Sequence, residues 1–227
     1  MATPTKPVEK PACLLVCSSH SKGVSAHSFI TAYTSASANF NVFIATPEGK
    51  TMEFVDLDDG SRQWLTQFKA KPIATPTNLD SIDGSKFIAL VIPSCPGALF
   101  DLATNRQLAS ILYQFVREKK PLCAVGFGVA GLFSAVDKQS QQWAFKDYSM
   151  TAPSLMDVAK REDFGSLPIM PADHIRKLGA TYSSSSLGGT HVVVDDHLVT
   201  GQDSVSTIPV IQNLFVVFSL QRQSKQR

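Results

Sequence analysis

Residues 121–132 read PLCAVGFGVAGL. Within this stretch, the apolar run Leu122–Val125 leads directly into a turn of small residues at 126–128. A short run that is apolar at every position is typical of a strand covered on both faces, as in a parallel sheet. A strand, a tight turn and a helix in this order form the elbow on which α/β enzymes hold a nucleophile. We therefore expect this segment at the functional edge of a parallel sheet.

Three further apolar runs have the same character and end in turn-forming residues: Ala12–Cys17, Asn41–Ala45 and Phe87–Ile92. Helical patterns separate these runs, over Val24–Asn39, Gln63–Lys69 and Arg106–Lys119. The last pattern carries one apolar stripe at helical spacing, formed by Leu108, Ile111, Leu112, Phe115 and Val116. Strands that alternate with helices predict an α/β fold with right-handed crossovers, built as a single-domain three-layer sandwich around a mostly parallel sheet.

The second half of the chain has shorter elements. We predict strands at Tyr148–Met150 and Ala180–Ser183, helices near Ser154–Arg161 and Ala172–Leu178, and a hairpin from His191 to Thr200 with an acidic turn at Asp195-Asp196. Pro209 suits the first turn of a final helix. The residues of that helix expected to face the sheet are Val210, Ile211, Leu214, Val217 and Phe218. No repeat or linker divides the chain, so we expect a disordered tail at 1–10, one domain at 11–220 and a flexible basic tail at 221–227.

Composition excludes several classes of protein. The chain has 227 residues, of which 44% are apolar and 18% charged, so it can build a core and is not predicted to be disordered. The formal charge is only +2, which gives no broad basic field for nucleic acid. Residues 1–10 lack an apolar signal core, and the apolar stretch at 208–220 is interrupted by polar residues. We predict a cytoplasmic protein that does not insert into membranes.

Four cysteines are present, at Cys13, Cys17, Cys95 and Cys123. Their spacing matches no zinc template, and so few thiols in a chain of this length do not suggest a disulfide framework. Aspartates are favoured in hairpin turns for local backbone reasons, so Asp195-Asp196 with the histidines at 191 and 197 does not indicate a metal site. We predict no metal and no cofactor.

Several motifs together resemble those of one superfamily. The segment at 93–102, PSCPGALFDL, is similar to a Pro-Gly-Gly-His-Gly-x-x-x-Asp-Leu loop, and the segment at 23–27, GVSAH, is similar to a Gly-Val-x-x-Glu helix start. Weaker similarities lie at 45–49, 177–180, 191–195 and 198–202. The sequence is identified on these motifs as a member of the PfpI/ThiJ superfamily of class I glutamine amidotransferase-like proteins. The resemblance covers nearly the whole chain and implies a flavodoxin-like, class I glutamine amidotransferase-like fold.

The catalytic positions depart from the superfamily pattern. Gly126 stands where the family has its nucleophilic cysteine, Phe127 replaces the adjacent histidine, and His27 replaces the activating glutamate. Covalent chemistry at the elbow is excluded because Gly126 offers no thiol. The N–H groups of Cys95 and Phe127 could survive as an oxyanion-type nest. The corresponding vestigial oxyanion loop is Ser94, Cys95 and Gly97, where serine and cysteine replace glycines that tolerate more conformations.

Three functional alternatives follow. A displaced thiol at Cys17 or Cys95, with His20 or His27 as the base, would make a cysteine-dependent hydrolase or a glyoxalase-like enzyme. The simpler interpretation of these thiols is that they fill space beside the vacated elbow, as buried free cysteines usually do. A module that binds a small molecule in the old pocket is the second alternative. The third is a pseudoenzyme that serves as an assembly subunit.

The resemblance favours the subunit. It implies a non-catalytic, homo-oligomeric component of an endosomal Rab-effector complex involved in mRNA transport, located in the cytoplasm on the periphery of early endosomes. The basic tail at 221–227 is too small to hold RNA alone, so any RNA association should be indirect and should depend on other subunits of the complex. Two aromatic pairs are candidate contact residues, Trp64 with Phe68 and Trp143 with Phe145, although both pairs could instead pack on the chain's own core.

Overall fold

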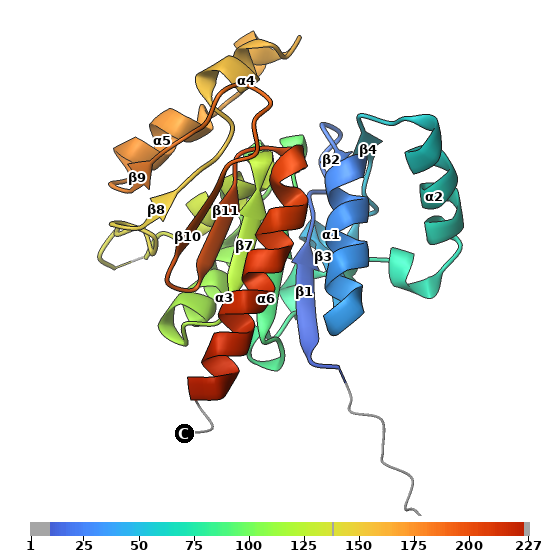
Figure 1. The fold of residues 1–227 in the computed structure, drawn as a ribbon, viewed down its shortest axis with the longest axis horizontal. Helices are drawn as coiled ribbons and strands as arrows, with labels where there is room; N and C mark the ends of the chain where they lie inside the picture. The colour runs from blue at the N-terminus through green and yellow to red at the C-terminus, as the bar shows by residue number, and fades with distance from the viewer. Residues whose placement is uncertain (1–9, 138, 225–227) are drawn as a thin grey trace, which may run out of the picture.

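The computed structural model of the chain describes residues 10–137 and 139–224. Its centre is a seven-stranded sheet in the order β10-β11-β7-β6-β1-β3-β5 (Figure 1). The strands are β1 (Ala12–Val16), β3 (Asn41–Thr46), β5 (Thr77–Asn78), β6 (Ala89–Ile92), β7 (Leu122–Val125), β10 (Val192–Asp195) and β11 (Leu198–Gly201). Every neighbouring pair is parallel except the β10–β11 hairpin. The predicted α/β fold with a mostly parallel sheet is confirmed.

Helices cover both faces of this sheet. α1 (Ala26–Asn39) and α6 (Thr207–Ser224) lie side by side on one face, whereas α3 (Arg106–Arg117) lies behind the sheet in Figure 1. The chain moves from β1 to β3 in one direction and from β6 to β7 in the other, so right-handed crossovers place α1 and α3 on opposite faces. This reversal lies between β1 and β6, at whose carboxyl ends open α/β sheets bind their ligands.

The remaining elements lie around the sheet. Two small two-stranded sheets pair β2 (Val24–Ser25) with β4 (Phe54–Val55), and β8 (Ser149–Met150) with β9 (Thr181–Tyr182). The other α-helices are α2 (Asp59–Lys69), α4 (Leu155–Ala159) and α5 (Pro171–Lys177). Short 3-10 helices are η1 (Pro47–Gly49), η2 (Pro72–Ala74), η3 (Leu79–Ser81), η4 (Gly84–Lys86), η5 (Pro96–Leu99), η6 (Gly126–Ser134), η7 (Phe164–Ser166) and η8 (Ser204–Ser206). The predicted strands in the second half of the chain are confirmed, whereas the β2–β4 pair was not predicted.

Helix α2 begins at Asp59, ahead of the predicted start at Gln63. The reason is a capping box: the Ser61 N–H donates to Asp58 Oδ1 at 2.6 Å, and the Asp58 N–H donates to Ser61 Oγ at 2.9 Å. The apolar periodicity that we used to predict this helix starts only after the cap.

The last helix also extends further than expected. Val210, Ile211, Leu214 and Val217 are buried as predicted, and Phe218 is half-buried. α6 continues to Ser224, so it includes residues 221–224 of the expected flexible tail. The rest of that tail and residues 1–9 lie outside the described residues. By length and mean hydropathy alone, Ser204–Ser224 could cross a membrane, but one face of this helix packs against β7, β11 and α1, as core helices do.

Both candidate aromatic pairs pack against the chain itself. Phe68 is buried and stacks on Trp64 at a centroid distance of 5.1 Å, and the pair contacts Phe29 of α1. Trp143 and Phe145 are both buried, and the Trp143 Nε1–H donates to the Leu132 carbonyl at 2.7 Å. Phe68, Trp143 and Phe145 are therefore core residues, and Trp64 is half-buried against Phe68.

His197 is a buried titratable residue in the turn of the β10–β11 hairpin. Its Nδ1 lies 3.4 Å from Asp196 Oδ2, and its Nε2 is buried without a hydrogen-bond partner among the described residues. The edge of its ring meets Tyr148, and Lys119 and Asp195 are the other charged neighbours. Burial lowers the pKa of His197, although Asp196 opposes this effect. The side chain is therefore expected to be neutral in the folded protein at neutral pH.

Mild acid should destabilise the fold through His197. The unfolded imidazole has a pKa of about 6.5 and the folded one a lower pKa, so the unfolded chain binds more protons between the two values. The free energy of unfolding should therefore fall below about pH 6.5, by at most about 1.4 kcal/mol per pH unit from this group. Urea unfolding at a series of pH values should show a weaker pH dependence for His197→Asn than for the unmodified chain.

His174 provides a comparison, because burial also lowers its pKa. His174→Asn should therefore likewise weaken the pH dependence of the free energy of unfolding. Asp101 and Asp203 act with the opposite sign, since burial raises the pKa of each carboxyl. An unchanged pH profile in His197→Asn would contradict the prediction.

Candidate functional site

The elbow after β7 keeps its backbone shape without its nucleophile. Gly126 has a φ of 53°, in the left-handed region, and begins the 3-10 helix η6, so the helix expected after the turn is a 3-10 helix. This turn directs the start of η6 toward the loop after β6, because η5 and η6 are in contact. The elbow therefore lies beside the β1–β6 crevice, where the topology predicts a site.

The space of the missing side chain is occupied from the opposite loop. A Cβ atom on Gly126 would lie 2.4 Å from Ser94 Oγ, closer than real Cβ contacts, and 3.0 Å from Ser94 Cβ, tighter than most of them. Ser94 is buried and follows β6, at a position where the superfamily loop has glycine. The serine hydroxyl thus takes part of the volume that a side chain at position 126 would need.

Hydroxyl groups fix Ser94 and its surroundings. The Ser94 N–H donates to Ser28 Oγ at 2.9 Å, and Ser28 Oγ also lies 2.9 Å from Thr207 Oγ1. The Ser94 carbonyl accepts from the Ser25 N–H at 2.9 Å, and the Ser204 hydroxyl donates to Ser25 Oγ at 3.2 Å. The loop after β6 is therefore tied to the first turns of both α1 and α6, which hold it in one position.

The predicted oxyanion loop is only partly free. The Ser94 N–H is used by Ser28, and the Gly97 N–H donates to the Gly23 carbonyl at 3.0 Å. Cys95 has an extended backbone, so the loop accepts residues other than glycine without strain. Within the described residues, the Cys95 N–H meets no acceptor, and the Phe127 N–H meets none outside its own helix. Two of the predicted donors remain available, and position 126 between them has no side chain.

A charged cluster covers Phe127. The ring is buried, and the Arg161 guanidinium lies over it at 5.0 Å from the centroid. Arg161 also binds Asp163 through Nε at 2.8 Å and through Nη2 at 3.1 Å, and Lys22 Nζ binds Asp163 at 2.9 Å. Arg161 and Lys22 lower the pKa of Asp163 to about 2. This cluster joins the loop after β1 to the segment between α4 and η7, a contact that the sequence analysis did not anticipate.

The candidate thiols have the environment of inert cysteines. All four cysteines are free and buried. Burial raises the pKa of Cys17, and the neighbouring Cys95 and Asp101 raise it further. The Cys95 thiol donates to the Pro93 carbonyl at 3.0 Å. A thiol that ionises less readily than a free cysteine is a poor nucleophile at neutral pH, since the thiolate is the reactive form.

Neither candidate base is paired with a thiol in the described part of the chain. His27 is exposed on α1, and His20 stacks on Phe100 with a centroid distance of 4.5 Å. His20 Nδ1 accepts the Lys22 N–H at 3.1 Å, so this nitrogen is occupied. The structure brings the loops that carry Cys17, Ser94, Cys95 and Gly126 to one edge of the sheet, but it does not assemble a thiol–imidazole pair from the predicted residues.

Asp101 has a structural role at the same edge. Its Oδ2 accepts the Ser18 hydroxyl at 2.9 Å and the N–H groups of Ser19 at 2.8 Å and His20 at 3.1 Å. It therefore holds the loop after β1 in place. Among the described residues there is no group of His, Cys, Asp and Glu suited to a metal ion. The hairpin histidines, at 191 and 197, each make one local side-chain contact through a ring nitrogen.

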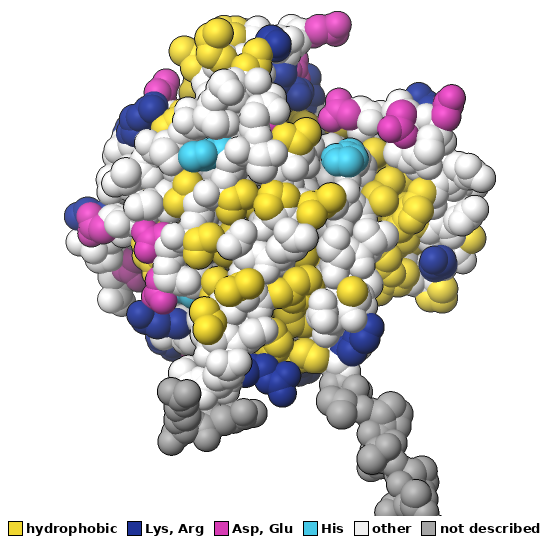
Figure 2. Space-filling model, in the orientation of Figure 1, with side chains coloured by type: hydrophobic (Ala, Val, Ile, Leu, Met, Phe, Trp, Pro, Cys, Tyr) yellow, Lys and Arg dark blue, Asp and Glu magenta, His cyan; other side chains and the backbone are white. Residues whose placement is uncertain are grey.

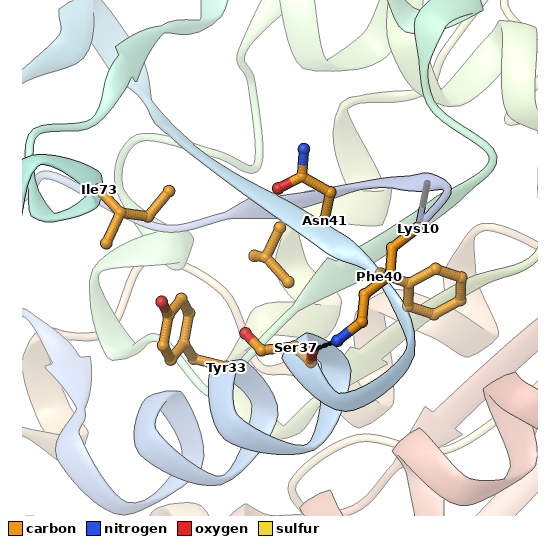
Figure 3. Close-up of a pocket in the computed structure, with 7 residues that line it drawn as sticks. Lys10, Tyr33, Ser37, Phe40, Asn41 and Ile73 are labelled. Carbon is orange, nitrogen blue, oxygen red and sulfur yellow. Dashed lines mark hydrogen bonds between the residues drawn. The ribbon is translucent and has the colours of Figure 1, made fainter. Parts of the chain in front are cut away.

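A surface hollow lies at the other edge of the sheet (Figure 3). Its volume is about 460 Å³, and it is lined by Lys10, Tyr33, Ser37, Phe40, Asn41, Val42 and Ile73. Lys10 Nζ donates to the Ser37 carbonyl at 2.8 Å, an interaction typical of a cation at a helix C-terminus. None of the residues predicted for the site lines this hollow.

Restoring a thiol at the elbow should destabilise the chain. Gly126→Cys places a Cβ against Ser94 and puts a non-glycine residue at positive φ, so we expect a loss of about 1–3 kcal/mol in the free energy of unfolding. Ser94→Gly should relieve the overlap, so the double variant should lose less stability than the sum of the two single variants. Urea unfolding of the four proteins measures this coupling. Strict additivity would show that Ser94 does not occupy the place of the nucleophile.

The chain is similar to known proteins over most of its length. The chain is 49% identical over 205 residues to the glutamine amidotransferase-like class 1 domain-containing protein 1 of Bos taurus, covering 90% of this chain and 93% of that protein. The protein of the same name from Homo sapiens is 48% identical over 205 residues, with the same coverage of both chains. No family model matches the sequence.

Solved structures share the fold at low sequence identity. The Rapid Encystment Protein 24 KDa of Francisella tularensis superposes with a TM-score of 0.81 at 20% identity, covering 92% of this chain and 99% of that one. Glyoxalase III of Candida albicans gives a TM-score of 0.79 at 16% identity, with coverages of 92% and 97%. DJ-1beta of Drosophila melanogaster gives 0.61 at 15% identity, with coverages of 90% and 88%. At these identities, the likenesses show a shared fold.

Proposed function

The chain belongs to the family of glutamine amidotransferase-like class 1 domain-containing protein 1, and from this membership we propose that it is a pseudoenzyme that acts as a homo-oligomeric subunit of a larger complex. The complex that we propose is an endosomal Rab effector that takes part in mRNA transport, with this chain in the cytoplasm at the surface of early endosomes. In this proposal, protein contacts replace catalysis as the function of the fold.

One observation carries the first half of the proposal. The elbow has glycine in place of the nucleophile, and Ser94 reaches into the volume that the nucleophile would occupy. A site that had merely lost its thiol would retain the space for it. Here a second residue fills that space, and the loop that bears it is tied by hydrogen bonds to α1 and α6. Such a rearrangement is expected where selection no longer maintains catalysis but still maintains packing.

The thiols and the charged cluster support the same proposal. Burial and neighbouring groups raise the pKa of Cys17, so it is not an activated nucleophile. Arg161 lies over the Phe127 ring and binds Asp163, which in turn binds Lys22, so charged side chains are held together beside the elbow. The chemistry present at this edge favours a closed, structural role.

The association with mRNA is proposed to be indirect. The formal charge of the whole chain is +2, and on the α1/α6 side of the molecule the Lys and Arg side chains are scattered around the margin (Figure 2). Tight binding to RNA needs several phosphate contacts, each of which is sensitive to salt. We propose that other subunits of the complex bind the RNA.

The proposed loss of catalysis predicts no turnover of amide, glyoxal or glycated substrates. The purified chain should show the uncatalysed rate in each assay, and Cys17→Ala and Cys95→Ala should leave that rate unchanged. A measurable turnover that disappears in either variant would establish a displaced thiol enzyme and contradict the proposal. Profiling with iodoacetamide at neutral pH gives an independent check, since all four cysteines should react slowly while the chain is folded.

The proposed complex is tested by affinity purification. A tagged full-length chain should co-purify with a fixed set of partners that includes a Rab-binding subunit, and the tagged chain should localise to early endosomes. RNA in the purified sample should be lost when the other subunits are removed. A chain that purifies alone, or that binds RNA tightly by itself at physiological salt, would contradict this part of the proposal.

A further inference from the structure

Two hollows adjoin between α2 and the segment at 51–57, which contains β4, at the right margin of the molecule in Figure 1. One has a volume of about 320 Å³ and the other of about 330 Å³, and Phe54 and Lys69 line both, so we call the two hollows together the α2 groove. Each hollow alone is at the lower end of the range for small-molecule sites, about 300–1,000 Å³, and the two together lie well within it. None of the residues placed at the elbow lines this groove.

The interior of the α2 groove is apolar. Leu65 and Phe68 of α2 are only 4% and 1% exposed, and Met52 is buried as well. Phe54 of β4 is half-buried, and its ring packs on Phe29 of α1 with a centroid distance of 5.0 Å. These contacts fix the Phe54 ring, so the groove offers an apolar surface on which a flat ligand can pack.

Two cations stand at the rim of the groove. Arg62, Thr66 and Lys69 are exposed and occupy positions i, i+4 and i+7 of α2, so they lie along one side of the helix. Lys69 Nζ lies over the Phe54 ring, 6.0 Å from its centroid. In the part of the chain that the structure describes, neither Arg62 nor Lys69 makes an ion pair. Among the described residues that line the groove, none is acidic.

Two other hollows have cations that are already engaged. In the hollow of Figure 3, Lys10 Nζ donates to the Ser37 carbonyl at 2.8 Å. A hollow beside α3 is lined by Arg117, whose guanidinium lies 3.5 Å from the Glu118 carboxylate. The α2 groove differs from both because its two positive charges have no negative partner in the described residues and stand beside an apolar interior.

We propose that the α2 groove binds a small amphipathic anion, that is, an organic molecule with a flat apolar body and one acidic group. The apolar body covers Phe54, and the acidic group lies between Lys69 and Arg62. These residues are about 10.5 Å apart along the helix axis, a gap that two long side chains can close on one anion. An exposed cation over a ring is held weakly, so Lys69 can turn from Phe54 to the anion and form the stronger, charge-assisted hydrogen bond. This site goes beyond the proposed function and does not depend on it.

Binding of anilinonaphthalene sulfonate to the full chain tests the site. This probe has a flat apolar body and a sulfonate, and its fluorescence rises in apolar surroundings. One equivalent should bind with a Kd of about 10–100 μM, as expected for a ligand of this size. Lys69→Met and Arg62→Met should each weaken binding at least about 10-fold, because each removes a charged donor and keeps an apolar stem. Lys69→Arg keeps the charge and should bind within about two-fold of the unmodified chain.

Two matched controls separate charge recognition from apolar contact. Lys71→Met makes the same exchange at an exposed lysine that lines neither hollow, so it should leave the affinity unchanged. Phenylnaphthylamine has the ring system of the probe without the sulfonate, so it should bind more weakly and equally well to the unmodified chain and to Lys69→Met. Added salt should weaken binding of the sulfonate alone. All four variants change exposed side chains, and their circular dichroism melts should match that of the unmodified chain.

Backbone amide NMR of the full chain locates the bound probe, and the largest shifts should lie at 51–57 and 62–75. Unchanged affinity in both Lys69→Met and Arg62→Met, an equal loss in Lys71→Met, or shifts concentrated outside these segments would each overturn the site. Binding to vesicles of phosphatidylcholine and phosphatidylserine that is lost in Lys69→Met, without binding of the free probe, would make the groove a membrane surface instead. These measurements use the chain alone, so their failure leaves the proposed complex standing, and a chain that captures no partner leaves the groove standing.

Discussion

Gly128→Ala should prevent normal folding or reduce the free energy of unfolding by about 3 kcal/mol or more. A Cβ at this position would lie 2.2 Å from the Pro93 carbonyl oxygen and 2.8 Å from that of Ile92. Both oxygens belong to the backbone at the end of β6, so no side chain can rotate away. The start of η6 would have to separate from β6, which disrupts the packing between the elbow and the neighbouring loop.

Gly165→Ala is the matched control. A Cβ on Gly165 meets nothing within 4 Å, and this glycine does not have a positive φ. The control should keep the stability of the unmodified chain, as measured by urea unfolding followed by circular dichroism. A Gly128→Ala protein with an unchanged unfolding midpoint would show that η6 lies further from β6 than the structure places it.

Phe127→Ala should reduce the free energy of unfolding by about 3–5 kcal/mol. The ring is only 9% exposed, and its removal would leave a cavity beneath the Arg161 guanidinium. Phe43→Ala removes the same atoms from a ring that is 41% exposed on β3, so it should cost much less. Both variants make the same Phe→Ala exchange, so the difference between their free energies of unfolding measures the effect of burying the ring. Equal losses in both would mean that Phe127 does not fill the vacated site.

The sequence was sufficient to predict six of the seven strands of the sheet, all except β5 (Thr77–Asn78). β1, β3, β6 and β7 begin or end within two residues of the apolar runs that predicted them. β1, β6 and β7 are buried on both faces, which favours apolar residues at every position, whereas β3 exposes Asn41 and Phe43. The β10–β11 hairpin was also predicted from its pattern, although its turn falls at Asp196-His197, one residue later than expected. In these elements, local pattern and tertiary environment agree.

Elements with little periodicity were less predictable. The segment at 126–134 forms a 3-10 helix, whereas we expected only a helix of unspecified type after the turn at 126–128, and three of its residues are glycines, which have low helix propensity. Contacts with the end of β6 decide its geometry, and the sequence does not show these contacts. The β2–β4 pair, which was not predicted, has only two residues in each strand, too few for an alternating pattern.

The sequence predicted where the candidate site lies in the fold, but it did not predict which residues contact one another there. The motif at 93–102 correctly placed Ser94 and Cys95 beside the elbow, but the approach of Ser94 to Gly126 depends on how two loops pack. Lys22 and Asp163 are 141 positions apart in the chain, and no pattern in either segment links them. His27 aligned with a catalytic glutamate, yet it is exposed, and the buried Ser28 next to it makes the contacts with Ser94 and Thr207.

The approach of Ser94 to Gly126 also limits how this lineage can evolve. A mutation that returns cysteine to position 126 arises in a background that already contains Ser94, so its first effect is a steric penalty with no catalytic gain. The mutation at position 94 that would remove the penalty gives no advantage while position 126 is glycine. Each step is unfavourable or neutral alone, so the two residues act as an epistatic ratchet. Catalysis at this elbow is therefore easier to lose than to regain.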